Sequence, residues 1–324
     1  MTMKTKTYAC YSLDEKERAL SSSGGIYPLI AKKVLEAGGV VYAACYDEEL
    51  NVVHKRISDA SEILKSQGSK YAASKLGSTF SDVTGDISSG KKVMFVGTPC
   101  QCAGLSSFVQ KKGLGRSGLL LLDFICHGVP GERAYKAYKD SFVSKGKKLV
   151  ALNMRDKSLG WSRSNYSFKE TFDDGSVRVT PRRQVPYMKG MLANLYTRPS
   201  CFKCRFKGAE RCTDITLGDY WGVWDQMPQM DDGGGTSLVL IHTDEGERLF
   251  EEIRPLIKSE EADIEMAASR NACLLRSTDY NPDKSKFYEG LDKGEDFDLI
   301  IERLTKESTA EKLFKKIKKK FLRR

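Results

Sequence analysis

Apolar runs and helical patterns alternate along the first half of the chain. Short runs of buried character predict strands, whereas apolar residues at helical spacing predict helices between them. The expected strands lie at 40–45, 91–96 and 119–125, and the expected helices at 26–37, 59–66, 98–111 and 131–143. Strands that alternate with helices favour an α/β fold with neighbouring parallel strands.

Beyond residue 150 the pattern changes. Segments 165–170 and 176–180, joined by Asp173-Asp174-Gly175, indicate a β-hairpin. The remaining pattern predicts further strands and helices around a cysteine-rich segment. These are helices at 185–195 and 245–257, strands at 214–217 and 237–242, and helical, highly charged residues over the last forty positions.

The net charge of +10 comes from 53 basic and 43 acidic residues among 324. Eight of the basic residues lie between 312 and 324, and without them the balance is 45 against 43. The body is therefore nearly neutral, which excludes an extended nucleic-acid-binding surface. Apolar residues recur at helical spacing in the basic tail, a pattern that suits an anionic membrane surface. A solvated helix end is the alternative.

No apolar run approaches the roughly 18 residues of a membrane-spanning helix. The N-terminus has no apolar signal core. We expect a cytoplasmic protein whose tail contacts the inner face of the membrane peripherally. Nine cysteines in such a chain favour metal or redox chemistry over disulfides.

The strongest local motif is the pair Cys201-Phe-Lys-Cys204, followed by Cys212. Two thiolates on one tight turn reach the same metal, and zinc and iron–sulfur sites both use this spacing. Neighbouring cations such as Lys207 lower thiol pKa values and offset negative charge. The pair leaves two functional classes open, a redox enzyme and a zinc-stabilised, non-catalytic scaffold protein.

Two further cysteines follow buried strands. Cys100 lies at a helix start that Thr98 can cap, and Cys126 follows the next strand. Adjacent parallel strands bring both to one sheet edge, where α/β folds bind ligands. With Cys201 and Cys204 they make four thiolates, the number that a 4Fe–4S cluster takes. His127 is a candidate catalytic proton donor, with a structural hydrogen bond as the alternative.

Two glycine-containing segments suit a cofactor. Residues 21–25, Ser-Ser-Ser-Gly-Gly, precede a helix and allow backbone N–H groups to approach a phosphate, although an ordinary helix cap has the same composition. Residues 218–222 carry Asp219 and Trp221 between glycines. An aromatic ring there suits stacking on a planar cofactor, with core packing as the alternative.

In combination, seven motifs resemble the beta subunits of coenzyme F420-reducing hydrogenases and related dehydrogenases, a family with bacterial members in polysaccharide gene neighbourhoods. The resemblance covers about residues 20–290. Its motifs are Ser22-Ser-Gly-Gly25, Gly68-Ser-Lys-Tyr71, Gly97-Thr-Pro-Cys-Gln101, Cys126-His-Gly-Val-Pro130, Arg155-Asp-Lys157 with Gly160-Trp161, Arg198-Pro-Ser-Cys-Phe-Lys-Cys204 and Asp214-Ile-Thr-Leu-Gly-Asp-Tyr-Trp-Gly222.

The resemblance implies an oxidoreductase with a 4Fe–4S cluster and FAD, with coenzyme F420 as a co-substrate. A ferredoxin-like or other redox protein would donate electrons, and a small molecule would accept a hydride. The implied cluster ligands are Cys100, Cys126, Cys201 and Cys204. Matching by motif, together with the two glycine-containing segments and the strand-end cap, gives the expected cofactor contacts Ser22, Ser23, Gly24, Gly25, Lys70, Tyr71, Thr98, Asp219 and Trp221.

We therefore expect an α/β fold with a mixed sheet and flanking helices, to which a β-hairpin and a cysteine-rich iron–sulfur insertion are added. The expected body spans 1–295, with an N-terminal part of about 1–95 and a C-terminal part of about 96–295, and the tail spans 296–324. Cys102 and Cys212 are extra thiols that compete for places in the ligand set.

Overall fold

The computed structural model describes residues 4–161 and 165–306. Its strands are β1 (Lys6–Ser12), β2 (Val40–Tyr46), β3 (Val52–Ile57), β4 (Val93–Gly97), β5 (Leu119–Phe124), β6 (Leu149–Asp156), β7 (Ser167–Phe172), β8 (Val177–Pro181), β9 (Ile215–Asp219), β10 (Ser237–Ile241) and β11 (Ile257–Glu261). Its α-helices are α1 (Glu15–Leu20), α2 (Ile26–Glu36), α3 (Ile63–Ser66), α4 (Thr79–Ser88), α5 (Pro99–Lys111), α6 (Glu132–Val143), α7 (Pro186–Leu192), α8 (Val223–Gln226), α9 (Asp244–Ile253), α10 (Ile264–Arg270), α11 (Ala272–Leu275), α12 (Lys284–Asp292) and α13 (Phe297–Thr305).

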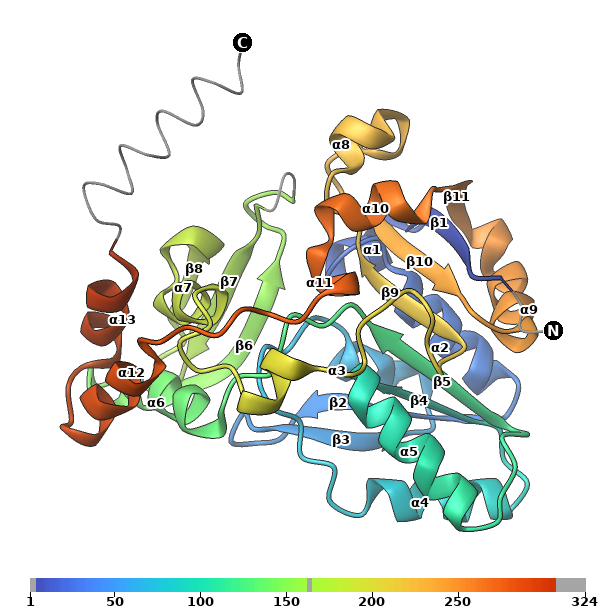
Figure 1. Ribbon diagram of the computed structural model, residues 1–324, viewed down its shortest axis with the longest axis horizontal. Coiled ribbons are helices and arrows are strands. Elements are labelled where there is room, and N and C mark those ends of the chain that lie inside the picture. The colour runs from blue at the N-terminus through green and yellow to red at the C-terminus, as the bar shows by residue number, and fades with distance from the viewer. Residues whose placement is uncertain (1–3, 162–164, 307–324) are drawn as a thin grey trace.

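Among the described residues, eight strands form the main sheet in the order β11-β1-β10-β9-β5-β4-β2-β3 (Figure 1). The central strands β9, β5, β4 and β2 run parallel to one another, and the outer pairings are antiparallel. The mixed sheet that the sequence predicts is thus confirmed. Strands β5 and β10 consist mainly of buried aliphatic residues because helices cover both of their faces.

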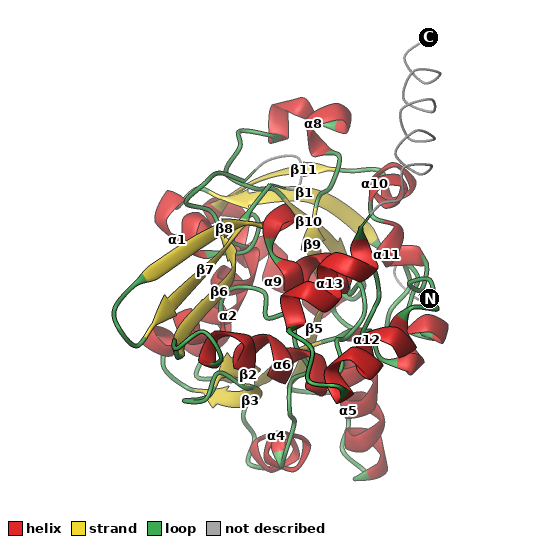
Figure 2. Cartoon of the chain, turned by 90° about the vertical axis from the view of Figure 1, so that its left-hand side faces the viewer, coloured by secondary structure: helices red, strands yellow, loops and turns green. Residues whose placement is uncertain are grey.

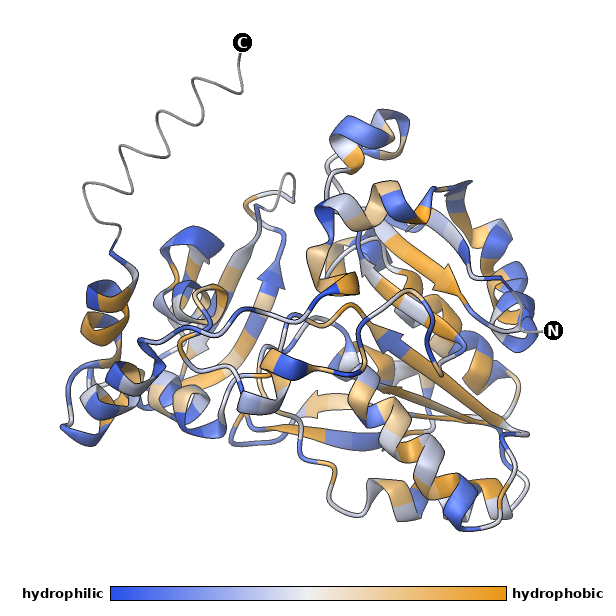
Figure 3. Cartoon of the chain, viewed as in Figure 1, coloured by the Kyte–Doolittle hydropathy of each residue, from blue (hydrophilic) through white to orange (hydrophobic). Residues whose placement is uncertain are grey.

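Helices cover both faces of the main sheet. Apolar residues of α2, α3 and α9 pack on one face. Residues of α4 and α5 cover the opposite face at the β2–β4–β5 end, and α8, α10 and α11 cover it near β1 and β10. Figure 3 shows hydrophobic residues concentrated in the strands between these layers. The result is a three-layer arrangement in which the central strands are mainly buried, whereas the edge strands β3 and β11 remain partly exposed.

A second sheet, β6-β7-β8, has a core of its own. Aromatic side chains of α6, α7, α12 and α13 pack around it, including Tyr138, Tyr187 and Phe297. Figure 2 shows α6 and α13 near the small sheet. Strands β7 and β8 are the hairpin that the sequence predicts, and their register pairs Ser167 with Pro181.

Three predicted helices are shorter in the structure than in the sequence analysis. In segment 59–66 residues 60–62 form a 3₁₀ helix and only α3 is α-helical, and α7 covers 186–192 of the predicted 185–195. The sequence pattern predicts a helix throughout 245–257, but α9 ends at Ile253 and the chain continues into β11. Pro255 lies just past this end, and a proline in a helix interior removes a backbone hydrogen bond and clashes with the preceding turn. Ile257 then begins the edge strand, which pairs with β1.

The basic amphipathic segment 312–324 lies outside the described residues. In the ranges that the structure describes, no helix combines the length and the apolar character needed to cross a lipid bilayer.

The side chain of His54 on β3 is buried against β4. Its imidazole stacks on Phe95, with ring centroids 5.0 Å apart. Its Nε2 lies 2.9 Å from the Val96 carbonyl oxygen, and its Nδ1 contacts the Ser74 hydroxyl. Burial lowers the pKa of His54 to about 4, because the charged imidazolium loses its hydration.

We expect His54→Gln to alter the pH dependence of folding. The unfolded chain binds a proton at His54 near pH 6.5, whereas the folded chain does so only near pH 4. This histidine therefore destabilises the fold progressively as the pH falls from 6.5 to 4, by roughly 3 kcal/mol. Urea denaturation at several pH values measures the effect. The free energies of unfolding of wild type and His54→Gln should converge, or cross, toward pH 4. A constant difference across this range contradicts the prediction.

Candidate functional site: a cysteine cavity beside a polar loop cluster

Strands β4 and β5 end at the same edge of the main sheet, with Gly97 opposite Asp123. Cys100 follows β4 in the first turn of α5, whose start is capped by Thr98 and Gln101. The backbone N–H of Thr98 donates to Gln101 Oε1 over 2.9 Å, and the Thr98 hydroxyl lies 3.1 Å from Cys100 Sγ. Cys126 follows β5. The prediction that these two thiols share one sheet edge is confirmed.

The Cys-x-x-Cys pair reaches this edge on a short 3₁₀ helix, η3 (Pro199–Lys203). The backbone N–H of Val129 donates to Cys201 Sγ over 3.4 Å, and that of Cys204 donates to Ser277 Oγ over 3.0 Å. A β-carbon at Gly128 would lie only 2.8 Å from Thr197 Cγ2, so the absence of a side chain there permits the close approach of the two segments.

Cys100, Cys126, Cys201 and Cys204 line one cavity of about 30 Å³, and all four are free thiols. They come from the end of β4, the end of β5 and η3. The other lining residues are Pro99, His127, Gly128, Val129, Phe206, Lys207 and Arg211. Within the described residues, no three His, Cys, Asp or Glu side chains form a group that could hold a single metal ion as they stand. The four thiols share the lining of one cavity.

The cavity combines a buried thiol with a nearby cation. Burial raises the pKa of the Cys126 thiol to about 12, and Cys201, Cys100 and Cys204 also raise it, whereas Lys207 lowers it. Lys207 Nζ donates to the carbonyl oxygens of Cys126 and, over 2.8 Å, Cys273. A cation held this close favours thiolates and any anionic group bound to them.

The two competing thiols lie elsewhere. Cys102 is fully buried in the core beneath α5, and its Sγ lies 3.6 Å from the Leu122 carbonyl oxygen. Cys212 is exposed and does not line the cavity. Neither Cys102 nor Cys212 therefore lines the cavity that the other four cysteines share.

His127 lines the cavity and is fixed on both sides. Its Nε2 lies 2.8 Å from Asn194 Oδ1, and its Nδ1 lies 3.4 Å from Cys273 Sγ. Burial lowers the pKa of His127, which favours the neutral imidazole. Sequence analysis did not single out Cys273, because it stands outside any motif and reaches His127 only through the position of α11.

A second cluster of predicted residues forms around the loop before α2. Arg155 Nη2 donates to the Ser22 carbonyl oxygen over 2.7 Å, and Trp161 Nε1 donates to the same oxygen over 2.9 Å. Lys157 Nζ donates over 2.6 Å to the Ser23 carbonyl oxygen. The Ser22 hydroxyl in turn lies 2.9 Å from that of Ser69. These contacts bring together motifs that are far apart in the sequence.

Arg155 organises the aromatic side of this cluster. It makes a bidentate ion pair with Asp219, with N–O distances of 2.7 and 2.8 Å, and donates to the Tyr71 hydroxyl over 3.1 Å. Trp221 stacks on Trp161 with ring centroids 5.4 Å apart. The Nε of Arg155 is buried and has no hydrogen-bond partner among the residues that the structure describes. Arg155 thus brings Asp219 and Tyr71 together beside the stacked tryptophans.

Lys70 also lies in this region. Its Nζ donates to the carbonyl oxygens of Ser66, Gln67 and Gly68 over 3.1, 2.9 and 3.2 Å. Burial lowers the pKa of Lys70 to about 8. Arg155 and Lys157 belong to a motif of the sequence analysis but were not among the predicted cofactor contacts. Their role, to donate hydrogen bonds to the carbonyl oxygens of Ser22 and Ser23, becomes visible only in the structure.

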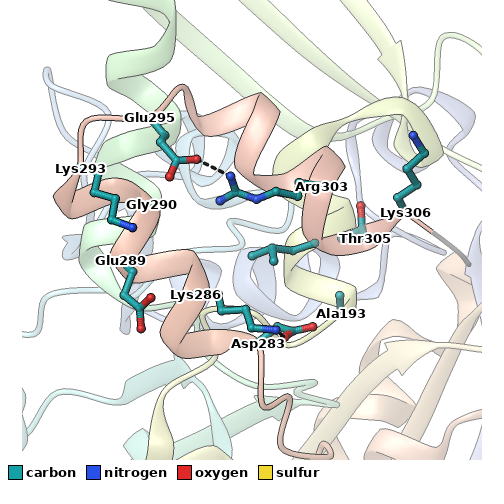
Figure 4. A pocket seen from close by; sticks show the side chains of 11 residues that line it. Ala193, Asp283, Lys286, Glu289, Gly290, Lys293, Glu295, Arg303, Thr305 and Lys306 are labelled. Carbon is teal, nitrogen blue, oxygen red and sulfur yellow. Dashed lines mark hydrogen bonds and ion pairs between the residues drawn. The ribbon is translucent and has the colours of Figure 1, made fainter.

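A larger cavity, of about 810 Å³, lies between α12, α13 and Ala193 (Figure 4). Its charges are mixed: Arg303 pairs with Glu295 over 2.7 Å and Lys286 pairs with Asp283 over 2.6 Å. None of the predicted site residues lines it. The candidate chemistry therefore belongs to the cysteine cavity and the loop cluster.

Comparison with known proteins bears on the family and the fold of the chain. Residues 7–80 match the family model for the N-terminal region of the coenzyme F420 hydrogenase/dehydrogenase beta subunit, and residues 90–266 match the model for its C-terminal region. No curated protein matches the chain. A chain of the F420-reducing [NiFe] hydrogenase complex from Methanosarcina barkeri, solved in a xenon derivatization study, shares the fold. It is 17% identical, with a TM-score of 0.55, and the match covers 82% of this chain and 89% of that chain.

We expect Gly24→Ala to destabilise the loop cluster. A β-carbon at this position would lie 2.4 Å from the Cys10 carbonyl oxygen and 2.9 Å from the Ser237 backbone nitrogen, neither of which can move without disturbing β1 or β10. The expected loss in the free energy of unfolding is about 1–3 kcal/mol, measured by urea denaturation. Gly85→Ala is the control, because a β-carbon there meets nothing within 4 Å and should stabilise α4. Equal stabilities for Gly24→Ala and wild type contradict this interpretation.

Proposed function

This chain belongs to the coenzyme F420 hydrogenase/dehydrogenase beta-subunit family, and we propose that it is an iron–sulfur flavoprotein oxidoreductase. In this proposal it passes electrons between a separate one-electron donor and a hydride acceptor through a 4Fe–4S cluster and FAD. The observation that carries the proposal is the convergence of four free thiols, from three segments, on one cavity.

Cys100, Cys126, Cys201 and Cys204 are the proposed cluster ligands. A bound 4Fe–4S cluster supplies one-electron transfer at a potential set by its surroundings. The donor set fits this group, since four cysteines are its usual ligands. The surroundings support the same assignment: Val129 donates an N–H to Cys201 Sγ over 3.4 Å, and Lys207 brings positive charge beside Cys126.

The loop cluster is the proposed FAD site. FAD, when bound, supplies hydride transfer. The buried Arg155 Nε, which has no hydrogen-bond partner among the described residues, suits an anionic cofactor. Burial lowers the pKa values of Lys70 and Lys157 to about 8 and about 7, so a bound anion would favour their charged forms. The close approach of Gly24 to β1 and β10 fixes the backbone to which a phosphate would bind. The proposed contacts are Ser22, Ser23, Gly24, Gly25, Lys70, Tyr71, Thr98, Asp219 and Trp221.

His127 is proposed as the group that holds a proton beside the cysteine cavity. In the neutral imidazole, Nε2–H donates to Asn194 Oδ1 and Nδ1 accepts from the Cys273 thiol, an assignment that satisfies both contacts. Asn194 therefore fixes the orientation of the ring, and Cys273 completes its hydrogen bonding.

The proposal includes partners and a location. A ferredoxin-like or other redox protein is the proposed donor, and coenzyme F420 or another small molecule the proposed hydride acceptor. The solved relative is described as part of a hydrogenase complex, which supports a redox-protein partner. The proposed location is the cytoplasm, and the proposed process is polysaccharide biosynthesis. The sequence predicts a body that ends at 295, but Phe297, Ile300 and Ile301 of α13 are buried in the core around the small sheet. The proposed tail at the inner face of the membrane is therefore the basic segment 312–324.

The ligand assignment predicts which cysteines are required for iron binding. After anaerobic reconstitution with iron and sulfide, Cys→Ser exchange at 100, 126, 201 or 204 should remove most of the bound iron and the visible absorption of the cluster. Cys212→Ser, the matched exposed control, should keep both. Iron, sulfide and zinc analysis checks the outcome. Stoichiometric zinc without iron, or loss of metal only in Cys212→Ser, contradicts the proposal and favours a zinc-stabilised scaffold.

The tail assignment predicts membrane binding that depends on charge. Removal of residues 312–324 takes away eight basic residues and should abolish co-sedimentation with vesicles of anionic lipid. The intact protein should bind less as salt rises, because screening weakens the attraction. Equal co-sedimentation of the full-length and shortened proteins refutes this assignment.

A further inference from the structure

Arg211 is a buried cation at the edge of the cysteine cavity. Its side chain is only 3% exposed, and it lines the cavity together with the four thiols. Its Nε donates to the Gly208 carbonyl oxygen over 3.2 Å, and its Nη1 donates to Asp123 Oδ2 over 3.0 Å. Its Nη2 is buried without a hydrogen-bond partner among the residues that the structure describes. A buried donor of this kind carries a free-energy cost unless an acceptor is supplied.

Asp123 and the residues that contact it fix the position of the Arg211 guanidinium. Asp123 is fully buried, and its Oδ1 accepts a hydrogen bond from the Thr216 hydroxyl. That hydroxyl also lies 2.9 Å from His242 Nε2. With Nε and Nη1 both fixed, the direction of Nη2 is fixed as well. Lys207, the other cation at the cavity, differs because its Nζ is already engaged by two carbonyl oxygens.

We propose that Arg211 Nη2 donates a hydrogen bond to a sulfur of the group that Cys100, Cys126, Cys201 and Cys204 hold, and thereby raises its reduction potential. This inference rests on the proposed iron–sulfur function. Reduction adds one electron and no proton, so the sulfurs become better acceptors and the N–H···S bond strengthens. Hydrogen bonds to cluster sulfurs are among the factors that set such potentials. Arg211 is thus a positioning and tuning residue for the electron-transfer site.

The test is a potentiometric titration of the full-length, anaerobically reconstituted protein with dithionite, followed by EPR of the reduced cluster. Arg211→Lys keeps a cation for Asp123 but loses the second arm of the guanidinium. The expected result is unchanged iron content and a reduction at least tenfold less favourable, which corresponds to a potential lower by about 59 mV for a one-electron couple.

Two further variants keep the test decisive. The double variant Asp123→Asn/Arg211→Met removes both charges of the buried pair, so no unpaired ion is left to unfold the protein, and it should lower the potential at least as far. Arg116→Lys is the matched control. The Arg116 guanidinium pairs with Asp214 over 2.7 Å and does not line the cavity. The reduction potential of the Arg116→Lys variant should therefore equal that of wild type.

The outcomes separate the two proposals. Equal potentials in wild type and both Arg211 variants, at equal iron content, overturn the role of Arg211 and leave the cluster assignment standing. A wild-type protein that binds no iron or sulfide overturns the proposed function itself. A lower potential in both Arg211 variants but not in Arg116→Lys supports the inference, because a merely structural role would not shift the potential selectively.

Discussion

The parallel pairing of β4 with β5 is the constraint on which the cysteine cavity depends. Their register places Gly97 opposite Asp123, so the segments that follow both strands start at one level of the same sheet edge. Cys100 and Cys126 meet there because each follows its strand by only a few residues. The helix start at Thr98 then fixes Cys100, and Gly128 allows η3 to bring Cys201 and Cys204 against them.

Charge is the second theme of the site. Lys207, Arg211 and Arg155 are cations placed at backbone carbonyls, carboxylates and cavities, where dehydration strengthens their electrostatic interactions. Asp123 and Asp219 balance two of them and fix their directions. Buried ionic groups thus gather around the two places where we propose anionic cofactors, although the body has almost no net charge.

Local patterns predicted much of this arrangement. Strand ends rich in buried aliphatic residues located Cys100 and Cys126, and Gly97-Thr-Pro predicted the helix cap at Thr98. The reciprocal hydrogen bonds with Gln101 became visible only in the structure. The edge strands β3 and β11 were not predicted, because short edge strands carry a weak apolar pattern and the helical spacing before Pro255 continues past it. Strand β1, which lies between β10 and β11, was not predicted either. Cys273 and Arg211 could not be placed, since their roles arise only when α11 and the segment after η3 fold onto the cavity. Cys102 differs from Cys100 by two helix positions, which turns it toward the core.

The central claim is that four cysteines from three segments hold one iron–sulfur cluster beside a flavin. Anomalous diffraction at the iron absorption edge, from crystals of anaerobically purified protein, tests it most directly. Our account predicts an iron peak in the cavity between Cys100, Cys126, Cys201 and Cys204, with flavin density against the loop around Ser22–Gly25. A zinc site formed by Cys201, Cys204 and Cys212, or a cavity without any metal peak, would contradict it.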